Sequence, residues 1–293
     1  MRIEGVFVAS ITPFKSGGDV DYEELSRHLE FLASQGVHGF VPCGTTGEGC
    51  SLNEEEWREI VRLTQAVAKR HGLSVIAGCG GNSPEKVLGL LRVARETGCD
   101  AGLVVTPYYN KPTQEGLKAY YQTLVAEIDF PIVLYNVPSR TGVNLLPETA
   151  AQLFRSSSRM IGIKEASGQY AQWMSIASKV DLSSCSLLAG DDDAFAIVLG
   201  LGGSGIISAA ANVIPKHFVT LFDFAVKGKW KEAFELQLKI YPLIRTLFLE
   251  TNPSPLKFAL QITRQSEGRL RLPLVPVTIE TEAAIRLALE SLL

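Results

Sequence analysis

Short runs of apolar and β-branched residues recur along the chain, separated by longer stretches in which apolar positions return every three or four residues. The short runs have the length of buried strands, and the longer stretches have the periodicity of amphipathic helices. Strands are predicted at residues 6–11, 39–42, 74–77, 101–106, 131–135, 160–163, 186–189 and 205–208. The clearest helical stretches are 22–34, 54–70, 84–97 and 114–127. The pattern indicates a regular alternation of strand and helix.

Polar and glycine residues mark the ends of several predicted helices. Asp21 and Asn53 precede helical stretches, as residues that cap helix N-termini do. Gly36, Gly72 and Gly98 follow the last turns, where glycine accepts the left-handed conformation that commonly ends a helix. These signals place helix boundaries independently of the apolar pattern.

Eight short strands separated by helices restrict the topology. Strands that are apolar on both faces belong to a parallel sheet covered by helices, and right-handed crossovers leave an open doubly wound sheet or a closed barrel. Each strand–helix repeat spans about 28 residues, so eight repeats fill roughly 230 residues, which is close to the usual size of that barrel. We therefore predict a (β/α)8 TIM barrel.

The strand pattern stops before the C-terminus. We expect the barrel to occupy residues 1–227, and residues 228–293 to form a C-terminal appendage of three helices. Trp230, Phe234, Tyr241, Ile244 and Phe248 trace one face of its first, long helix, and shorter helical runs follow at 255–263 and 280–292. The Pro-rich stretch at 271–276 is typical of a connector.

Composition and charge exclude several classes of protein. The 293 residues carry 28 Lys and Arg against 31 Asp and Glu, with no basic tract, which argues against a nucleic-acid-binding protein. No apolar run is long enough to span a bilayer, and the N-terminus lacks the pattern of a signal peptide. The five cysteines form no CxxC pair and are expected to be free thiols. We expect a cytoplasmic protein that binds neither membranes nor nucleic acid.

In a TIM barrel the functional residues lie where the strands end and the loops converge. Lys164 follows a buried strand in the run Met-Ile-Gly-Ile-Lys-Glu, and we expect its side chain to enter the barrel mouth. Burial disfavours the ammonium form, so such a lysine can act as a nucleophilic amine and form a Schiff base with a carbonyl substrate. The alternative is a lysine paired with a carboxylate at the rim.

Hydroxyl groups and one guanidinium end the neighbouring strands. Tyr135 is a candidate proton donor and acceptor for imine chemistry, with Thr45 or Thr46 and a second phenol, Tyr109, as relay groups. Arg140 presents a planar fork that suits a carboxylate. Packing in the core or at the rim remains the alternative for each tyrosine, and a surface ion pair for Arg140.

Two further signals do not support a cofactor. Gly200, Gly202 and Gly205 match GxGxxG, but they follow a helix and precede a strand, the reverse of the order in a dinucleotide fold. Asp191–Asp193 are consecutive and have no histidine near them in sequence, and Asp191 can equally serve as a helix N-cap. We expect no cofactor and no metal.

Four strand-end segments together resemble the dihydrodipicolinate synthase / N-acetylneuraminate lyase family. They are Gly-Thr-Thr-Gly-Glu at 44–48, Thr-Pro-Tyr-Tyr-Asn at 106–110, Tyr-Asn-Val-Pro-Ser-Arg-Thr-Gly at 135–142 and Ile-Lys-Glu-Ala-Ser-Gly at 163–168. The Glu-Thr-Asn-Pro run at 250–253 is also typical of the family, so the resemblance covers nearly the whole chain.

The resemblance implies the condensation of pyruvate with L-aspartate 4-semialdehyde, on the path to diaminopimelate and lysine. In that reaction Lys164 would form the pyruvate imine and Tyr135 would shuttle protons. Thr45 and Tyr109 would complete the proton relay, and Thr46 would hold the pyruvate carboxylate. The alternative within the family is an aldolase acting on a keto sugar acid such as N-acetylneuraminate, and a third reading is a non-catalytic barrel that binds a keto acid.

The resemblance also implies roles for Arg140, Gly190 and Ile206. Arg140 would bind the carboxylate of the semialdehyde, and its Ser-Arg-Thr-Gly context favours the synthase over the sugar-acid aldolases. Gly190 and Ile206 would line the site through their backbone groups. The family further implies a homotetramer of two tight dimers in which Tyr109 reaches the site of the partner subunit.

Three positions differ from the lysine-inhibited bacterial members of the family. They carry Glu54, Trp57 and Lys86. We expect feedback inhibition by lysine to be weak or absent, because the positive charge of Lys86 would repel a cationic effector.

Overall fold

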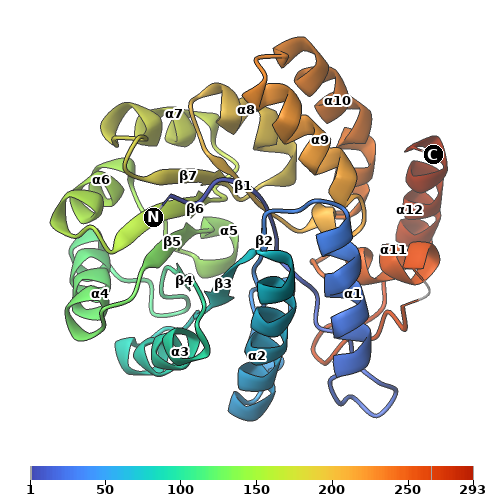
Figure 1. Ribbon diagram of the computed structural model, residues 1–293, viewed down its shortest axis with the longest axis horizontal. Coiled ribbons are helices and arrows are strands. Elements are labelled where there is room, and N and C mark those ends of the chain that lie inside the picture. The colour runs from blue at the N-terminus through green and yellow to red at the C-terminus, as the bar shows by residue number, and fades with distance from the viewer. Residues whose placement is uncertain (1, 265, 293) are drawn as a thin grey trace.

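The computed structural model describes residues 2–264 and 266–292, and these residues form a closed barrel of parallel strands in sequence order (Figure 1). Strand β8 pairs with β1 and closes the circle, which confirms the predicted TIM barrel. The strands are β1 (Gly5–Val8), β2 (Gly39–Phe40), β3 (Ser74–Gly78), β4 (Ala101–Val105), β5 (Ile132–Asn136), β6 (Met160–Glu165), β7 (Ser186–Ala189) and β8 (Gly205–Ser208).

Helices surround the barrel in the ring that Figure 1 shows. They are α1 (Tyr22–Ser34), α2 (Glu54–His71), α3 (Pro84–Thr97), α4 (Gln114–Glu127), α5 (Pro138–Thr141), α6 (Pro147–Ser156), α7 (Tyr170–Lys179), α8 (Phe195–Gly200) and α9 (Pro215–Val226). Short 3-10 turns lie at η1 (Gly49–Ser51), η2 (Asp192–Ala194) and η3 (Ala210–Asn212). Asp21 and Asn53 cap α1 and α2 as predicted, since their side chains accept hydrogen bonds from the backbone N–H of Glu24 and Glu56.

Two strands end earlier than the apolar pattern predicts. Strand β1 ends at Val8 and β2 at Phe40, although the apolar runs continue to residues 11 and 42. The residues that follow stay buried, for example Ile11 and Val41, and backbone hydrogen bonds still join the two segments, since the Val41 N–H donates to the Val8 carbonyl at 2.7 Å and the Ser10 N–H to the Val41 carbonyl at 3.2 Å. The apolar runs therefore mark backbone that stays paired for one or two residues beyond the regular strands.

Apolar side chains fill two separate layers. An inner cluster inside the barrel includes Phe7, Val133 and Ile207, and an outer cluster between the strands and the helices includes Val6, Leu134 and Ile206. Successive strand residues thus alternate between the two layers, as the pleat of a strand requires.

Three helices follow the barrel, namely α10 (Trp230–Thr246), α11 (Ser254–Arg264) and α12 (Ile279–Leu292). Helix α10 packs along α9 and α12, and α11 and α12 lie to one side of the barrel in Figure 1. The aromatic face of α10 differs from the prediction, because Ile244 is buried whereas Trp230, Phe234 and Tyr241 are about 40% exposed. Among the described residues, no helix is both long enough and apolar enough to cross a membrane.

The contact between β1 and β8 generates a prediction about barrel closure. A Cβ atom on Gly205 would lie 2.1 Å from the carbonyl oxygen of Gly5, so Gly205→Ala must push the two strands apart. We expect the variant to lose about 3 kcal/mol or more of unfolding free energy in urea denaturation.

Gly89→Ala is the matched control for barrel closure. Gly89 is exposed on α3, and a Cβ atom there would meet nothing within 4 Å. We expect this variant to gain up to about 1 kcal/mol, because alanine is the better helix former. Equal stability of the two variants would contradict the role assigned to Gly205.

Candidate active site

Lys164 and Tyr135 lie side by side inside the barrel mouth. They are register partners on β6 and β5, and the Nζ atom of Lys164 lies 4.5 Å from the centre of the Tyr135 ring. Lys164 is 7% exposed and Tyr135 is 8% exposed. An amine and a phenol therefore lie close together in nearly dry surroundings.

A one-residue register shift in β6 sets the direction of the Lys164 side chain. Ile132 pairs with Met160, but the next residue, Val133, pairs with Gly162, so Ile161 is an extra residue. Because side chains alternate along a strand, one extra residue reverses the faces of all residues beyond it. Lys164 consequently faces inward beside Tyr135.

A buried polar network centred on Glu165 stabilises this register. The Glu165 carboxylate accepts hydrogen bonds from Asn136 Nδ2 at 3.0 Å, from Gln172 Nε2 at 2.9 Å and from the Ser167 N–H at 2.7 Å. Burial raises the pKa of Glu165, and these donors counteract the rise. Asn136 and Glu165 are register partners one step beyond Tyr135 and Lys164, so their contact holds β5 and β6 in alignment.

The loop after β2 brings Thr46 into the mouth. Thr46 is 3% exposed, and Asn252 Nδ2 donates to its hydroxyl oxygen at 3.0 Å. Thr12 Oγ1 donates to the Gly47 carbonyl at 2.7 Å, which ties this loop to the one after β1. The neighbouring Thr45 is partly exposed. Thr46 is thus held by a residue of the C-terminal appendage.

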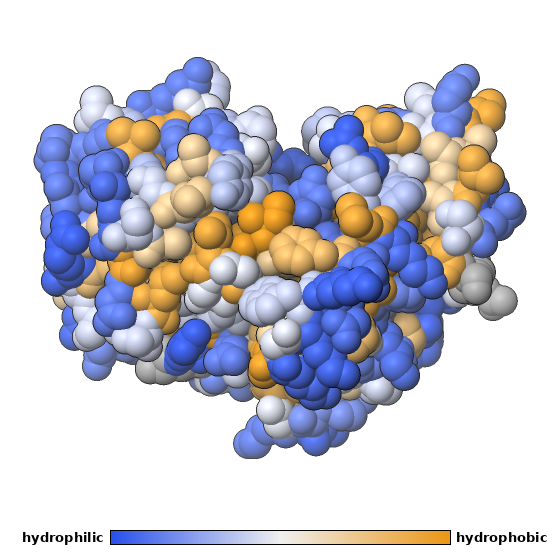
Figure 2. All heavy atoms as spheres, turned by 90° about the horizontal axis from the view of Figure 1, so that it is seen from above, coloured by the Kyte–Doolittle hydropathy of each residue, from blue (hydrophilic) through white to orange (hydrophobic). Residues whose placement is uncertain are grey.

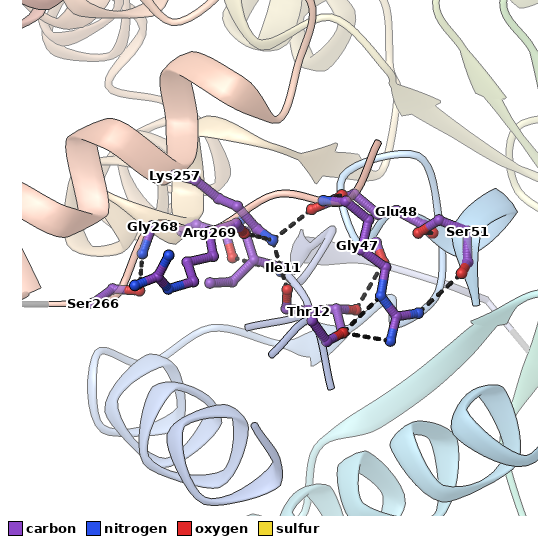
Figure 3. A network of polar contacts seen from close by, with 12 residues as sticks. Ile11, Thr12, Gly47, Glu48, Ser51, Lys257, Ser266, Gly268 and Arg269 are labelled. Atoms are coloured by element: carbon purple, nitrogen blue, oxygen red, sulfur yellow. Dashed lines mark hydrogen bonds and ion pairs between the residues drawn. The ribbon is translucent and has the colours of Figure 1, made fainter. Parts of the chain in front are cut away.

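A buried ion pair lies beneath the same loop (Figure 3). Lys257 Nζ, on α11, lies 2.5 Å from Glu48 Oε1, and the two side chains are 1% and 2% exposed. The Lys257 ammonium also donates to the carbonyls of Thr12 and Arg269, each at 2.7 Å. Such a pair keeps its charges in the interior because every donor of the ammonium has a partner.

Arg140 lies on the short helix α5 at the edge of a cavity of about 450 Å³. Its Nη2 atom lies 3.4 Å from the backbone carbonyl of Asn252, and the same cavity is lined by Ser139, Glu250 and Thr251. Residue 252 therefore contacts both Thr46 and Arg140. The cavity offers a guanidinium to a molecule larger than a keto acid.

Two acidic residues after β7 lie close enough to Lys164 for its charge to affect their pKa values. Burial raises the pKa of Asp191 and of Asp192 to about 6, and the Lys164 charge partly opposes this rise. Asp191 stands at the predicted N-cap position of the following turn, η2, but its side chain accepts from the Gly168 N–H at 3.0 Å and makes no cap hydrogen bond. Asp192 accepts from the Ala210 N–H at 3.0 Å, which joins the loops after β7 and β8.

The remaining sequence-predicted residues occupy different places. Gly190 follows β7, and its N–H donates to the Glu165 carbonyl at 2.8 Å. The Ile206 side chain packs in the outer cluster, so its backbone alone can face the mouth. Tyr109 is 90% exposed and has a left-handed backbone with φ of 74°, so it does not join Lys164 within one chain.

Sequence reasoning did not identify Asn252, Lys257 or Asp192 as part of the site. Asn252 stands in the Glu-Thr-Asn-Pro run, which gave a signal of resemblance but not of a contact. Lys257 lies within an otherwise apolar helical stretch, and that was the available sign that it is buried and paired. Contacts between residues about 200 positions apart leave no local pattern.

A family model decides the relationship. The model of the Dihydrodipicolinate synthetase family matches residues 2–292. The chain belongs to this family. Relatives include the 4-hydroxy-tetrahydrodipicolinate synthase of Methanococcus aeolicus, which is 43% identical over 288 residues, with 98% of each chain covered.

Solved structures of dihydrodipicolinate synthases have the same fold. The enzyme from Thermotoga maritima superposes with a TM-score of 0.96 at 41% identity, with 99% of each chain covered. A monomeric dihydrodipicolinate synthase variant also superposes with a TM-score of 0.96, at 40% identity, covering 99% of this chain and 96% of its own. The relatives' names favour the synthase over the keto-sugar-acid aldolase expected as the alternative.

The buried Asp192 generates a prediction about pH. Its pKa is about 6 in the folded protein against an ordinary 3.8, so the folded state binds its proton more tightly. The favourable contribution of Asp192 to the free energy of unfolding is therefore complete below about pH 4, and it is lost as the pH rises through about 6. In Asp192→Asn this loss is absent, and we expect the stability of the variant relative to the wild type to improve by about 3 kcal/mol between pH 4 and 7.

Urea unfolding of both proteins across this pH range measures the difference. Asparagine still accepts from the Ala210 N–H, so the packing is preserved. A stability difference that stays constant with pH would show that Asp192 does not titrate in this window.

Proposed function

We propose that the chain is a 4-hydroxy-tetrahydrodipicolinate synthase, which condenses pyruvate with L-aspartate 4-semialdehyde through a Schiff base on Lys164. The observation that carries this proposal is the buried Lys164 amine beside the Tyr135 phenol. Family membership and the names of the relatives support the choice of reaction.

The chemistry follows from the two side chains. The Lys164 amine attacks the keto carbon of pyruvate, the carbonyl oxygen leaves as water, and an imine forms. Loss of a proton from the pyruvate methyl group then gives an enamine, whose carbon attacks the aldehyde of the second substrate. Tyr135 is close enough to donate and accept the protons that these steps exchange, with Thr45 and the partner subunit's Tyr109 as the onward relay.

In this proposal the carboxylates of the two substrates bind to different side chains. Thr46 lies on the loop after β2 and binds the pyruvate carboxylate, with backbone groups of Gly190 and Ile206 lining the same space. Arg140 binds the carboxylate of the semialdehyde from the edge of the cavity. No cofactor or metal takes part in this scheme.

Assembly and location are also part of the proposal. We propose a homotetramer in the cytoplasm, with the barrel ending at residue 227. Helices α7, α8 and α10 lie at the top of Figure 1, and Figure 2 shows this side of the molecule from above. Apolar residues gather on it. Phe234, Leu238 and Tyr241 of α10 are 42%, 71% and 42% exposed, as a subunit contact requires. The exposed Tyr109 supports a second contact that inserts it into a neighbouring site.

Reductive trapping tests the Schiff base and the substrates together. With pyruvate and borohydride, we expect a covalent adduct on Lys164 in the wild type and in the exposed-lysine control Lys69→Ala, and none in Lys164→Ala. We expect pyruvate-dependent consumption of the semialdehyde and no pyruvate release from N-acetylneuraminate. An adduct on another lysine would overturn the mechanism, and release from N-acetylneuraminate alone would overturn the substrate.

Arg140 provides a test of the second substrate. In Arg140→Ala the semialdehyde loses a charge-assisted partner worth about 1.5–3 kcal/mol, so its KM should rise tenfold or more. The KM of pyruvate should change by less than about twofold, since Thr46 remains. Steady-state kinetics with each substrate varied measures both, and an equal rise for the two substrates would refute the assignment.

A further inference from the structure

The loop that carries Thr45 and Thr46 is held in an unfavourable backbone conformation. Cys43 and Glu48, at its two ends, have φ of 58° and 51°, in the left-handed region that favours glycine. A Cβ on Gly49 would lie 2.1 Å from the Cys43 carbonyl oxygen, so the ends of the loop also approach each other closely. Such a conformation persists only where surrounding groups hold it in place.

The surrounding groups come from the C-terminal appendage. Glu48 is fixed at both carboxylate oxygens, because Oε1 accepts from Lys257 Nζ and Oε2 accepts from the Arg271 N–H at 3.0 Å. Asn252, five residues before Lys257, donates to Thr46 in the middle of the loop. One short stretch of the appendage therefore holds the loop at both Thr46 and Glu48.

Arg271 anchors that stretch to the barrel. Its guanidinium donates to the carbonyls of Gly18 and Ser51, each at 2.9 Å, and pairs with Glu56 on α2. Two cations also lie against the Phe14 ring, since Lys257 Nζ and the Arg271 guanidinium are 4.3 and 4.4 Å from its centre. The position of Lys257 is thus fixed relative to the loops after β1 and β2.

We propose that Lys257 is a positioning residue for the pyruvate-binding loop, acting through Glu48 to hold Thr46 where it meets the substrate carboxylate. This proposal rests on the role given above to Thr46. Lys257 itself is buried beneath the loop and contacts no reacting atom. The appendage is in this view a working part of the active site.

The physical reason lies in the dry surroundings of the pair. Burial lowers the pKa of Lys257, and the adjacent Glu48 carboxylate opposes this shift. If the ammonium is removed, Glu48 becomes a buried anion without its counter-charge, and it must take up a proton or turn toward water. Either response releases the left-handed turn at residue 48, and Thr46, two residues away, moves with it.

Lys257→Met tests the proposal, because methionine fills a similar volume without the charge. For the folded variant we expect the KM of pyruvate to rise about tenfold, the KM of the semialdehyde to change less than threefold, and borohydride trapping on Lys164 to slow at low pyruvate. The double variant Lys257→Met/Glu48→Gln removes both charges. We expect it to regain much of the lost resistance to urea but to keep the raised KM of pyruvate.

Leu289→Ala is the control for a general loosening of the appendage. Leu289 is buried on α12 and takes no part in the contacts to the loop. We expect this variant to lose stability and to keep the wild-type KM of pyruvate.

Three results would overturn the proposal. They are an unchanged KM of pyruvate in the folded single or double variant, an equal rise in Leu289→Ala, and failure of both Lys257 variants to fold, which would make the pair a requirement of the fold alone. Absence of a Lys164 adduct in the wild type would instead refute the proposed function, so the two failures are distinguishable.

Discussion

The direction of the Lys164 side chain depends on one extra residue in β6. Met160 packs in the outer cluster, and strict alternation from there would point residue 164 outward as well. The shift at Ile161 turns Lys164 inward, level with Tyr135. On the other side of β6, Gly162 allows close pairing with β7, because a Cβ atom there would lie 2.6 Å from the Ser186 carbonyl oxygen. The position of the reactive amine in the barrel mouth thus depends on the register of β6.

The charges around the mouth are organised by burial. Glu165 is stabilised by neutral donors, Glu48 by a cation, and Asp192 by the Ala210 N–H, the Ser208 side chain and the nearby Lys164. Burial raises the pKa of Glu165 and of Asp192, and hydrogen-bond donors oppose the rise in both, whereas Glu48 has the Lys257 ammonium as a counter-charge. Three buried carboxylates therefore lie near the mouth, each with a different kind of partner.

The sequence predicted the alternation of elements well, because each strand and helix carries its own periodicity and its own caps. It also predicted that Lys164 and Tyr135 would meet, since both end neighbouring strands. The lengths of β1 and β2 were overestimated because apolar residues such as Ile11 continue into buried loops. Asn252 and Lys257 could not be predicted as neighbours of Thr46 and Glu48, since nothing local records which distant segment packs beneath a loop. The roles of the individual site residues remain predictions.

The connection between the appendage and the first loops has a consequence for the order in which the molecule is completed. Thr12, Gly18 and Thr46 leave the ribosome early, whereas their partners between residues 252 and 271 leave it more than 200 residues later. The strands can close as soon as β8 has emerged, well before those partners are available. A nascent chain can therefore have the outline of the finished barrel while the threonine loop still lacks the residues that hold it, and the site is completed only when residues 252–271 have emerged.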